Sequence, residues 1–141
     1  MTNNIRPFHL AIPVTDISLA YDFYVDMLGC EIGRSTDKWI DFNLRGNQIT
    51  AHLKPQECDI NKYNFVDGDK VPVRHFGLIL EWGEWHEFSE MLIKRKTKFI
   101  LDPKIRFKGK IGEQATFFIA DPSGNALEFK AFKSKNNIFL N

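Results

Sequence analysis

Two histidines and one glutamate are the residues of this sequence best suited to hold a metal ion. His9 and His75 stand 66 residues apart, each near the start of a strand-like segment, and Glu128 lies in another such segment near the C-terminus. Two neutral imidazoles and one carboxylate suit a divalent first-row ion; the same trio binds Fe(II) in non-haem oxygenases, and Mn, Zn or Ni would also fit. The alternative is that each is an ordinary half-buried or solvated strand residue.

The three side chains are expected on one face of a sheet, because successive residues of a strand point to opposite faces. Apolar side chains alternate with His9 in residues 8–14, with His75 in residues 74–80 and with Glu128 in residues 125–132. The apolar face is the natural partner of amphipathic helices, which leaves the other face open as a cavity. The trio is therefore predicted to share the open face.

An internal repeat of about 66 residues sets the expected architecture. Each histidine-bearing strand is followed by a helical pattern, within residues 17–28 and 85–96, for the first of which Ser18 is the expected N-cap and Gly29 the stop. The strand candidates that follow are residues 31–34, 38–44, 48–53, 98–101, 114–120 and 125–132. The predicted fold class is α+β, with two βαβββ modules forming a curved mixed sheet, helices on its convex face and the metal site in its concave cavity.

Length and composition indicate one globular domain over residues 1–141, with module 1 at 7–54, a polar linker at 55–72 and module 2 at 73–133. No apolar run approaches the ~20 residues that would span a membrane. A net charge of +1 gives no global field for nucleic acid, so the expected partner is a small-molecule substrate. Without a secretory signal or a CxxC pair, a cytoplasmic protein with two reduced thiols is expected.

The chain resembles the vicinal-oxygen-chelate superfamily, which includes glyoxalase I, extradiol dioxygenases, fosfomycin-resistance enzymes and bleomycin-binding proteins. FHLAIPV at residues 8–14, HFGLIL at 75–80 and DPSGNALEF at 121–129 carry this resemblance over nearly the whole chain. It implies a homodimer and the ligands His9, His75 and Glu128. More closely, WIDFNLRGNQITAHL and RFKGKIGEQATFF look like a bacterial subgroup labelled predicted extradiol-type dioxygenases.

Thr50 and His52 bear on which chemistry the site performs. Members similar to glyoxalase I take a fourth ligand, Glu or Gln, from the strand position that the repeat assigns to Thr50. Threonine is a poor ligand, so we expect a three-ligand centre open to two substrate oxygens and O₂, as ring cleavage requires. His52, on the same face, is the candidate catalytic acid or base for a catechol hydroxyl. It could instead be a fourth ligand or a solvated residue.

Arg106, Gln114 and Thr50 are the candidate substrate-binding residues. The run from Lys104 to Lys110 places alternate cations on one strand face, where Arg106 could hold a substrate carboxylate through a two-pronged pair. A solvated charged edge is the commoner role of such a run. Gln114, together with Glu113, could line the same cavity.

The favoured function is an Fe(II)-dependent extradiol-type dioxygenase. Against it, the tyrosine that such enzymes use about ten residues before the ligand glutamate is Phe118 here, and their second active-site histidine has no counterpart in residues 99–120. One alternative is a glyoxalase-type lyase or isomerase that uses Mn, Ni or Zn. Another is a metal-free binding or resistance protein that sequesters an aromatic drug between subunits.

Overall fold

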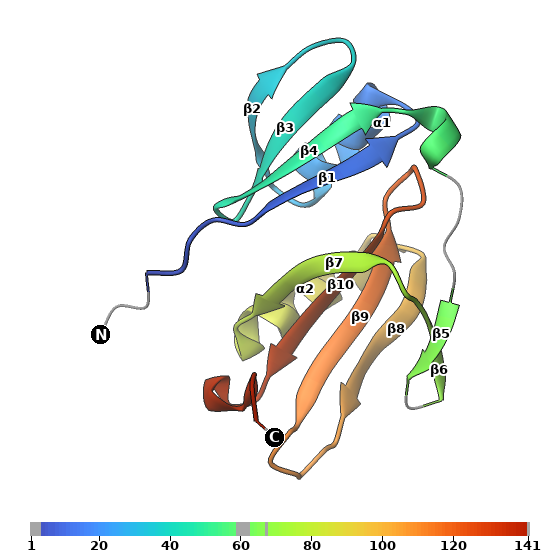
Figure 1. The fold of residues 1–141 in the computed structure, drawn as a ribbon. Coiled ribbons are helices and arrows are strands. Elements are labelled where there is room, and N and C mark those ends of the chain that lie inside the picture. The colour runs from blue at the N-terminus through green and yellow to red at the C-terminus, as the bar shows by residue number, and fades with distance from the viewer. Residues whose placement is uncertain (1–3, 59–62, 67, 141) are drawn as a thin grey trace. The chain divides into compact units, whose positions relative to one another are not determined.

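The computed structural model describes residues 4–58, 63–66 and 68–140, which form two compact units. Unit 1 comprises the chain up to residue 60 together with Asp121–Asn125, and unit 2 comprises residues 61–120 and 126–141. Each unit holds one βαβββ module with a four-stranded mixed sheet of its own (Figure 1). The predicted α+β fold of two βαβββ modules is confirmed.

The sheet of unit 1 has the strand order β1-β4-β3-β2. Strand β1 runs parallel to β4, and the other neighbours are antiparallel. Burial follows the predicted alternation, since Ile12 and Val14 of β1 are buried whereas His9 and Ala11 are exposed. The elements are β1 (His9–Val14), α1 (Ile17–Tyr21), η1 (Asp22–Met27), β2 (Glu31–Ser35), β3 (Trp39–Leu44), β4 (Asn47–Leu53) and η2 (Pro55–Glu57).

The helix of unit 1 differs from the expected one at its start and in its pitch. The predicted N-cap at Ser18 is wrong, because Asp16 has the extended backbone of a cap and its carboxylate accepts the amide of Leu19 at 2.9 Å. After five residues the helix widens into the π-helical turns of η1. Ala20, Phe23 and Tyr24 are buried along this helix, while Tyr21 is 38% exposed.

The turn Asp121–Asn125 belongs to unit 1 although it joins two strands of unit 2. The Tyr24 hydroxyl donates to the Asp121 carboxylate at 2.8 Å, the amide of Thr15 donates to the Ser123 hydroxyl at 2.8 Å, and the Asn125 side chain donates to the carbonyl of Pro13 at 2.8 Å. Side chains of this turn therefore satisfy polar groups at the end of β1 and in the helix that follows it.

The sheet of unit 2 repeats the same design with the order β7-β10-β9-β8, and β7 runs parallel to β10. A two-stranded hairpin, β5-β6, lies in the segment predicted as a polar linker. No described helix has the length and apolar character needed to cross a membrane. The elements are β5 (Tyr63–Val66), β6 (Asp69–Pro72), β7 (His75–Leu80), α2 (Trp82–Lys94), β8 (Phe99–Arg106), β9 (Gln114–Ala120), β10 (Ala126–Phe132) and η3 (Lys135–Asn137).

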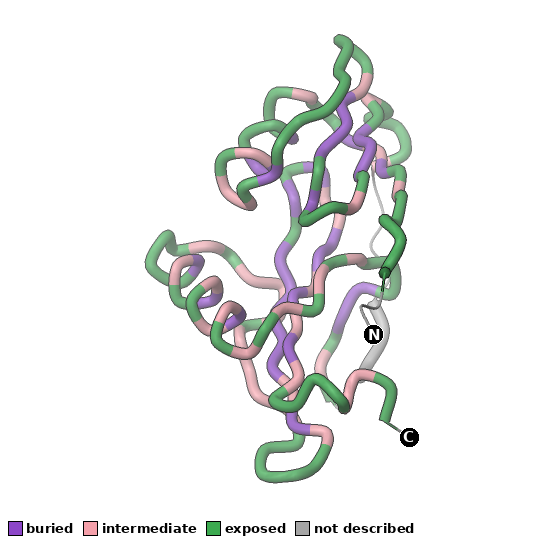
Figure 2. The backbone as a smooth tube through the Cα atoms, turned by 90° about the vertical axis from the view of Figure 1, so that its left-hand side faces the viewer, coloured by how far each residue is buried: buried purple, intermediate pink, exposed green. Residues whose placement is uncertain are grey.

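Helix α2 covers the apolar face of this second sheet. The indole N–H of Trp85 donates to the carbonyl of Phe129 at 2.8 Å, and the ring of Phe88 meets those of Phe117 and Phe129 at 5.6 and 5.1 Å. Buried residues are concentrated in β9 and β10 of this unit, and exposed residues make up much of the loops and chain ends in Figure 2. Because one face is filled by aromatic packing, the polar residues of β7, β9 and β10 are left on the other.

Strand β8 is longer than the predicted segment 98–101 and reaches Arg106. The expected alternation of cations from Lys104 to Lys110 is wrong beyond that point, because Phe107 has a φ of 54° and the chain leaves the strand. Lys108 and Lys110 therefore lie in the exposed connection to β9, whereas Lys104 and Arg106 keep their places in the sheet.

Candidate metal centre

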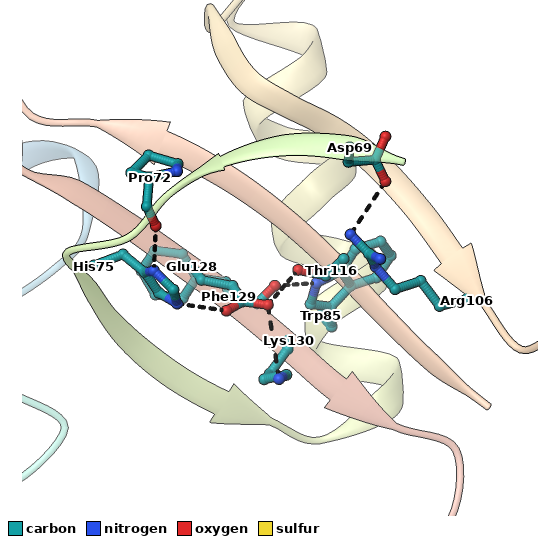
Figure 3. Close-up of polar contacts among 9 residues, drawn as sticks. All are labelled: Asp69, Pro72, His75, Trp85, Arg106, Thr116, Glu128, Phe129 and Lys130. Carbon is teal, nitrogen blue, oxygen red and sulfur yellow. Dashed lines mark hydrogen bonds and ion pairs between the residues drawn. The ribbon is translucent and has the colours of Figure 1, made fainter. Parts of the chain in front are cut away.

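His75 and Glu128 are in direct contact on the sheet of unit 2 (Figure 3). His75 is the first residue of β7, and Glu128 lies on the neighbouring parallel strand β10. Nε2 of His75 lies 3.1 Å from Oε2 of Glu128, and the two side chains are 31% and 16% exposed. The pair is thus partly shielded from water and still open to a small ligand.

The other ring nitrogen of His75 is held by the backbone. Nδ1 lies 2.8 Å from the carbonyl oxygen of Pro72, the last residue of β6. A carbonyl oxygen can only accept, so Nδ1 donates its proton there and Nε2 is the nitrogen turned to Glu128. Metal-binding histidines are commonly oriented by such an N–H to carbonyl bond, which fixes the tautomer and the direction of the ring.

Glu128 has further partners on the same face of the sheet. The hydroxyl of Thr116 on β9 donates to Oε1 at 2.8 Å, and Nζ of Lys130 lies 3.7 Å from the same oxygen. The ring of Phe118, directly across from Glu128 on β9, meets the imidazole of His75 edge-on at 4.9 Å. The carboxylate is thus held by polar groups beside an apolar wall.

The pair shifts the protonation of both of its members. The hydrogen bond with Glu128 raises the pKa of His75 above its ordinary value, against the opposing effect of burial. Burial by itself would raise the pKa of Glu128, but the hydrogen bond from His75 and the charge of Lys130 bring that pKa below its ordinary value. Without a metal, the pair is therefore an imidazolium beside a carboxylate in mildly acidic solution.

The donor set of this pair fits a divalent ion. Two ligands at right angles on an ion bound at about 2.1 Å lie roughly 3 Å apart, and Nε2 of His75 and Oε2 of Glu128 are 3.1 Å apart. Imidazole nitrogen and carboxylate oxygen both suit Fe, Mn, Zn and Ni. Within either unit, the described residues form no group of three His, Cys, Asp or Glu side chains that would hold an ion by itself.

His9, Thr50 and His52 share one face of the sheet in unit 1. In the parallel register of β1 and β4, His9 lies opposite Gln48 and Thr50 lies opposite Ala11, so the odd residues of β1 and the even residues of β4 point the same way. His9 and His52 are exposed. Thr50 is only 8% exposed, and its hydroxyl donates to a carboxylate oxygen of Asp41 at 2.7 Å.

Asp41 is a residue of this face that the sequence analysis missed. It lies on β3 directly opposite Thr50, is 6% exposed and has Nε of Arg34 at 3.7 Å. The guanidinium of Arg34 also lies 5.4 Å from the ring centre of Trp39. The sequence pattern could have indicated it, because Asp41 stands between the apolar Ile40 and Phe42 and therefore points to the polar face of its strand.

Arg106 already has an acidic partner. Its side chain is 9% exposed, and Nη2 lies 3.1 Å from Oδ2 of Asp69 on β6 (Figure 3). Nζ of Lys104 lies 2.6 Å from the same oxygen, and its hydrogen bond lowers the pKa of Asp69. Asp69 was not foreseen, because it falls in the segment predicted as a linker. A substrate carboxylate at Arg106 would compete with this pair.

Gln114 and Glu113 do not share a role. Gln114 lies opposite Arg106 in the register of β8 and β9 and shares its face of the sheet. Glu113 precedes the strand, is 6% exposed, and accepts the amide of Gly109 at 2.7 Å with Nζ of Lys133 at 3.5 Å. Glu113 therefore holds the connection between β8 and β9, and Gln114 is the one of the two that lies beside Arg106.

Comparison with known proteins gives the class of protein that this fold and site define. The family model of the Glyoxalase/Bleomycin resistance protein/Dioxygenase superfamily matches residues 6–129. The chain belongs to this superfamily. Among curated protein sequences no significant match is found.

Solved structures agree with this assignment. A glyoxalase/bleomycin resistance protein/dioxygenase from Alicyclobacillus acidocaldarius is 35% identical with a TM-score of 0.77, covering 99% of this chain and 100% of its own. A fosfomycin resistance protein from Listeria monocytogenes is 17% identical with a TM-score of 0.69, covering 98% and 100%. A lactoylglutathione lyase from Agrobacterium tumefaciens is 19% identical with a TM-score of 0.67, covering 94% and 97%. The last two likenesses concern the fold alone.

Proposed function

We propose that this protein is a metal-dependent enzyme that binds a small substrate through two neighbouring oxygens, with His9, His75 and Glu128 as the metal ligands. The observation that carries the proposal is the contact between Nε2 of His75 and Oε2 of Glu128 at 3.1 Å, with the other ring nitrogen bound to the carbonyl of Pro72. His9 is proposed because it begins β1 as His75 begins β7, at the equivalent place of the repeat. A divalent ion, with Fe(II) first and Mn, Zn or Ni as alternatives, would polarise the bound oxygens.

Within this class we favour extradiol-type dioxygenation. The hydroxyl of Thr50 is engaged by Asp41, which supports a centre without a fourth ligand at that position. Three protein ligands leave the open positions that ring cleavage needs. His52, exposed on the same face of unit 1, is the proposed group that takes and returns the proton of a substrate hydroxyl. Arg106, Gln114 and Thr50 remain proposed substrate-binding residues.

Phe118 is the observation that favours glyoxalase-type lyase or isomerase chemistry as the alternative. It packs against His75 and lies opposite Glu128, where it supplies an apolar wall and no hydroxyl to move a proton. A reaction that needs only one acid or base beside the metal is compatible with that wall. Mn, Ni or Zn would be the metal in this case.

Metal binding is the first test. Protein loaded anaerobically with Fe(II) is expected to retain about one ion per chain by elemental analysis, and His75→Ala and Glu128→Ala are each expected to abolish retention with an unchanged circular dichroism spectrum. His86→Ala, which removes a histidine of α2 whose ring meets those of Trp82 and Trp85, is the matched control and keeps the ion. Wild-type protein that retains no divalent ion would disprove the centre and leave the metal-free binding protein.

The reaction and the assembly need separate measurements. Oxygen uptake by the Fe(II) protein across a series of catechols is expected for at least one of them, and no uptake with any would move the assignment to glyoxalase-type chemistry with the Mn, Ni or Zn protein. We also propose a homodimer, as the resemblance implies. Light scattering after size exclusion tests it, and a monomeric mass would contradict it.

A further inference from the structure

The two oxygens of the Glu128 carboxylate have different surroundings. Oε2 faces the imidazole of His75 at 3.1 Å. Oε1 accepts the hydroxyl hydrogen of Thr116 at 2.8 Å and has the ammonium group of Lys130 at 3.7 Å. One oxygen is therefore turned to the other candidate ligand, while the second is occupied by the neighbouring strand.

We propose that Thr116 is a positioning residue: its hydroxyl holds Oε1 of Glu128, so that Oε2 would be the single oxygen offered to the ion. This inference rests on the proposed metal centre and adds a residue to it. The last torsion of a glutamate is broad, so the carboxylate plane needs an external partner to fix it. Partners bound to the outer oxygen of a ligating carboxylate supply this orientation.

Thr116 is itself well fixed. It lies in β9 between β10 and β8, opposite Lys130 on one side and Lys104 on the other, and is 1% exposed. Its neighbours Ala115 and Phe117 are fully buried. A β-branched side chain in such a strand has few accessible χ1 values, so its hydroxyl has a set direction.

Lys130 does not serve the same purpose. Its Nζ lies 3.7 Å from Oε1, beyond hydrogen-bond distance, and its side chain is 31% exposed. An ammonium on a flexible stem supplies charge without a fixed direction. Lys130 therefore acts on the carboxylate through its charge, whereas the directed hydrogen bond of Thr116 sets the orientation of the carboxylate.

Thr116→Val tests this role because it keeps the branched shape and replaces the hydroxyl with a methyl group. With Oε1 released, the carboxylate is free to turn or to place both oxygens on the ion, and the affinity for divalent metal is expected to fall by about 10- to 100-fold. Thr116→Ser returns the hydroxyl and is expected to restore most of the affinity. Ser89→Ala removes another buried hydroxyl of unit 2, one that donates to the carbonyl of His86, and serves as the control with unchanged affinity.

The experiment is a titration of the metal-free proteins with Mn(II) and Co(II). Dissociation constants, the electron paramagnetic resonance spectrum of bound Mn(II) and the visible spectrum of bound Co(II) are recorded, with circular dichroism to verify folding. A weaker and spectrally altered site in Thr116→Val, restored in Thr116→Ser, supports the role, since a purely structural threonine would leave the spectra unchanged. If the valine variant misfolds, Thr116→Ala carries the same test.

Two failures are distinguishable in that titration. Wild-type binding with an unchanged affinity and spectrum in Thr116→Val would overturn the positioning role and leave the metal centre standing. No binding by the wild-type protein would overturn the metal centre and this role with it.

Discussion

Gly77 of β7 lies opposite Glu128 of β10 with no room for a side chain between the two strands. A β-carbon at position 77 would stand 1.6 Å from the carbonyl oxygen of Glu128 and 2.6 Å from its carbonyl carbon. Both atoms belong to the backbone, which does not rotate out of the way as a side chain would. The glycine thus permits the close approach of the two strands that carry His75 and Glu128.

Gly77→Ala is expected to destabilise the protein by about 3 kcal/mol, the upper part of the range for overpacking, because the two strands must separate. The same shift would displace His75 from Glu128, so metal affinity is expected to fall as well. Urea unfolding and metal titration measure the two effects. Gly83→Ala is the matched control: its β-carbon would meet nothing within 4 Å, and alanine in α2 is expected to be neutral or stabilising by about 0.5–1 kcal/mol. Equal stability of the two variants would contradict the close approach.

The His75–Glu128 pair predicts a pH dependence of stability in the metal-free protein. The pKa of His75 is raised above 6.5, so its contribution is complete below about pH 6.5 and is lost as the pH rises through the raised value. The pKa of Glu128 is lowered below 4.5, so its contribution is present above that pH and is lost as the pH falls through the lowered value. The pair therefore stabilises the fold most between about pH 4.5 and 6.5.

Melting temperatures of metal-free wild type and His75→Gln, measured from pH 4 to 8.5, test this dependence. The advantage of the wild type is expected to shrink as the pH rises above 6.5, because the imidazole loses the proton that it shares with Glu128. Bound metal requires the neutral imidazole, so the apparent metal affinity is expected to rise over the same interval. A wild-type advantage that grows with pH in the absence of metal would reverse the assigned direction.

His52→Gln is expected to lower kcat by about 10²- to 10⁴-fold while the metal content stays unchanged, as loss of a general acid or base does. His86→Gln, on α2, is the control with normal kcat. Loss of metal in His52→Gln would instead assign His52 as a fourth ligand.

Tyr24→Phe is expected to cost about 1–3 kcal/mol of unfolding free energy, since it leaves a buried carboxylate oxygen without one of its donors. The Tyr24 hydroxyl lies 2.8 Å from Oδ2 of Asp121, and burial raises the pKa of this phenol well above its ordinary value, so it donates as a neutral group. Tyr21→Phe, at a site 38% exposed, is the control with little change in urea denaturation. Identical midpoints for the two variants would show that the buried hydrogen bond adds nothing.

Strand alternation and the repeat predicted the fold because both depend on local patterns. Polar and apolar side chains alternate along these strands, so that His9 and Ile12, or Glu128 and Phe129, fall on opposite faces. Each sheet therefore has one apolar face that must be covered. The helix of unit 1 escaped this reasoning. Its change to π-helical turns after Tyr21 was not predicted, because a 3.6-residue pattern does not indicate where a helix changes its pitch.

The parts of the candidate site that the sequence missed are those set by tertiary neighbours. Thr116 is an unremarkable strand threonine until β9 is paired with β10, which puts its hydroxyl on Glu128. Asp69 lies in a polar segment without periodicity, and only the β5-β6 hairpin gives it Lys104 and Arg106 as partners. Residue type indicates what a side chain can bind, and its strand neighbours decide what it does bind.

The turn Asp121–Asn125 also makes the first half of the repeat depend on residues from the second half of the chain. A fragment ending in the polar segment after β4 would keep every strand of the first sheet and lose the acceptors for the Tyr24 hydroxyl and the Thr15 amide. The first half of the chain alone is therefore an incomplete folding unit, although the two halves share one βαβββ design. If the two halves were expressed as separate fragments, the second fragment would have to supply the turn Asp121–Asn125 to the first.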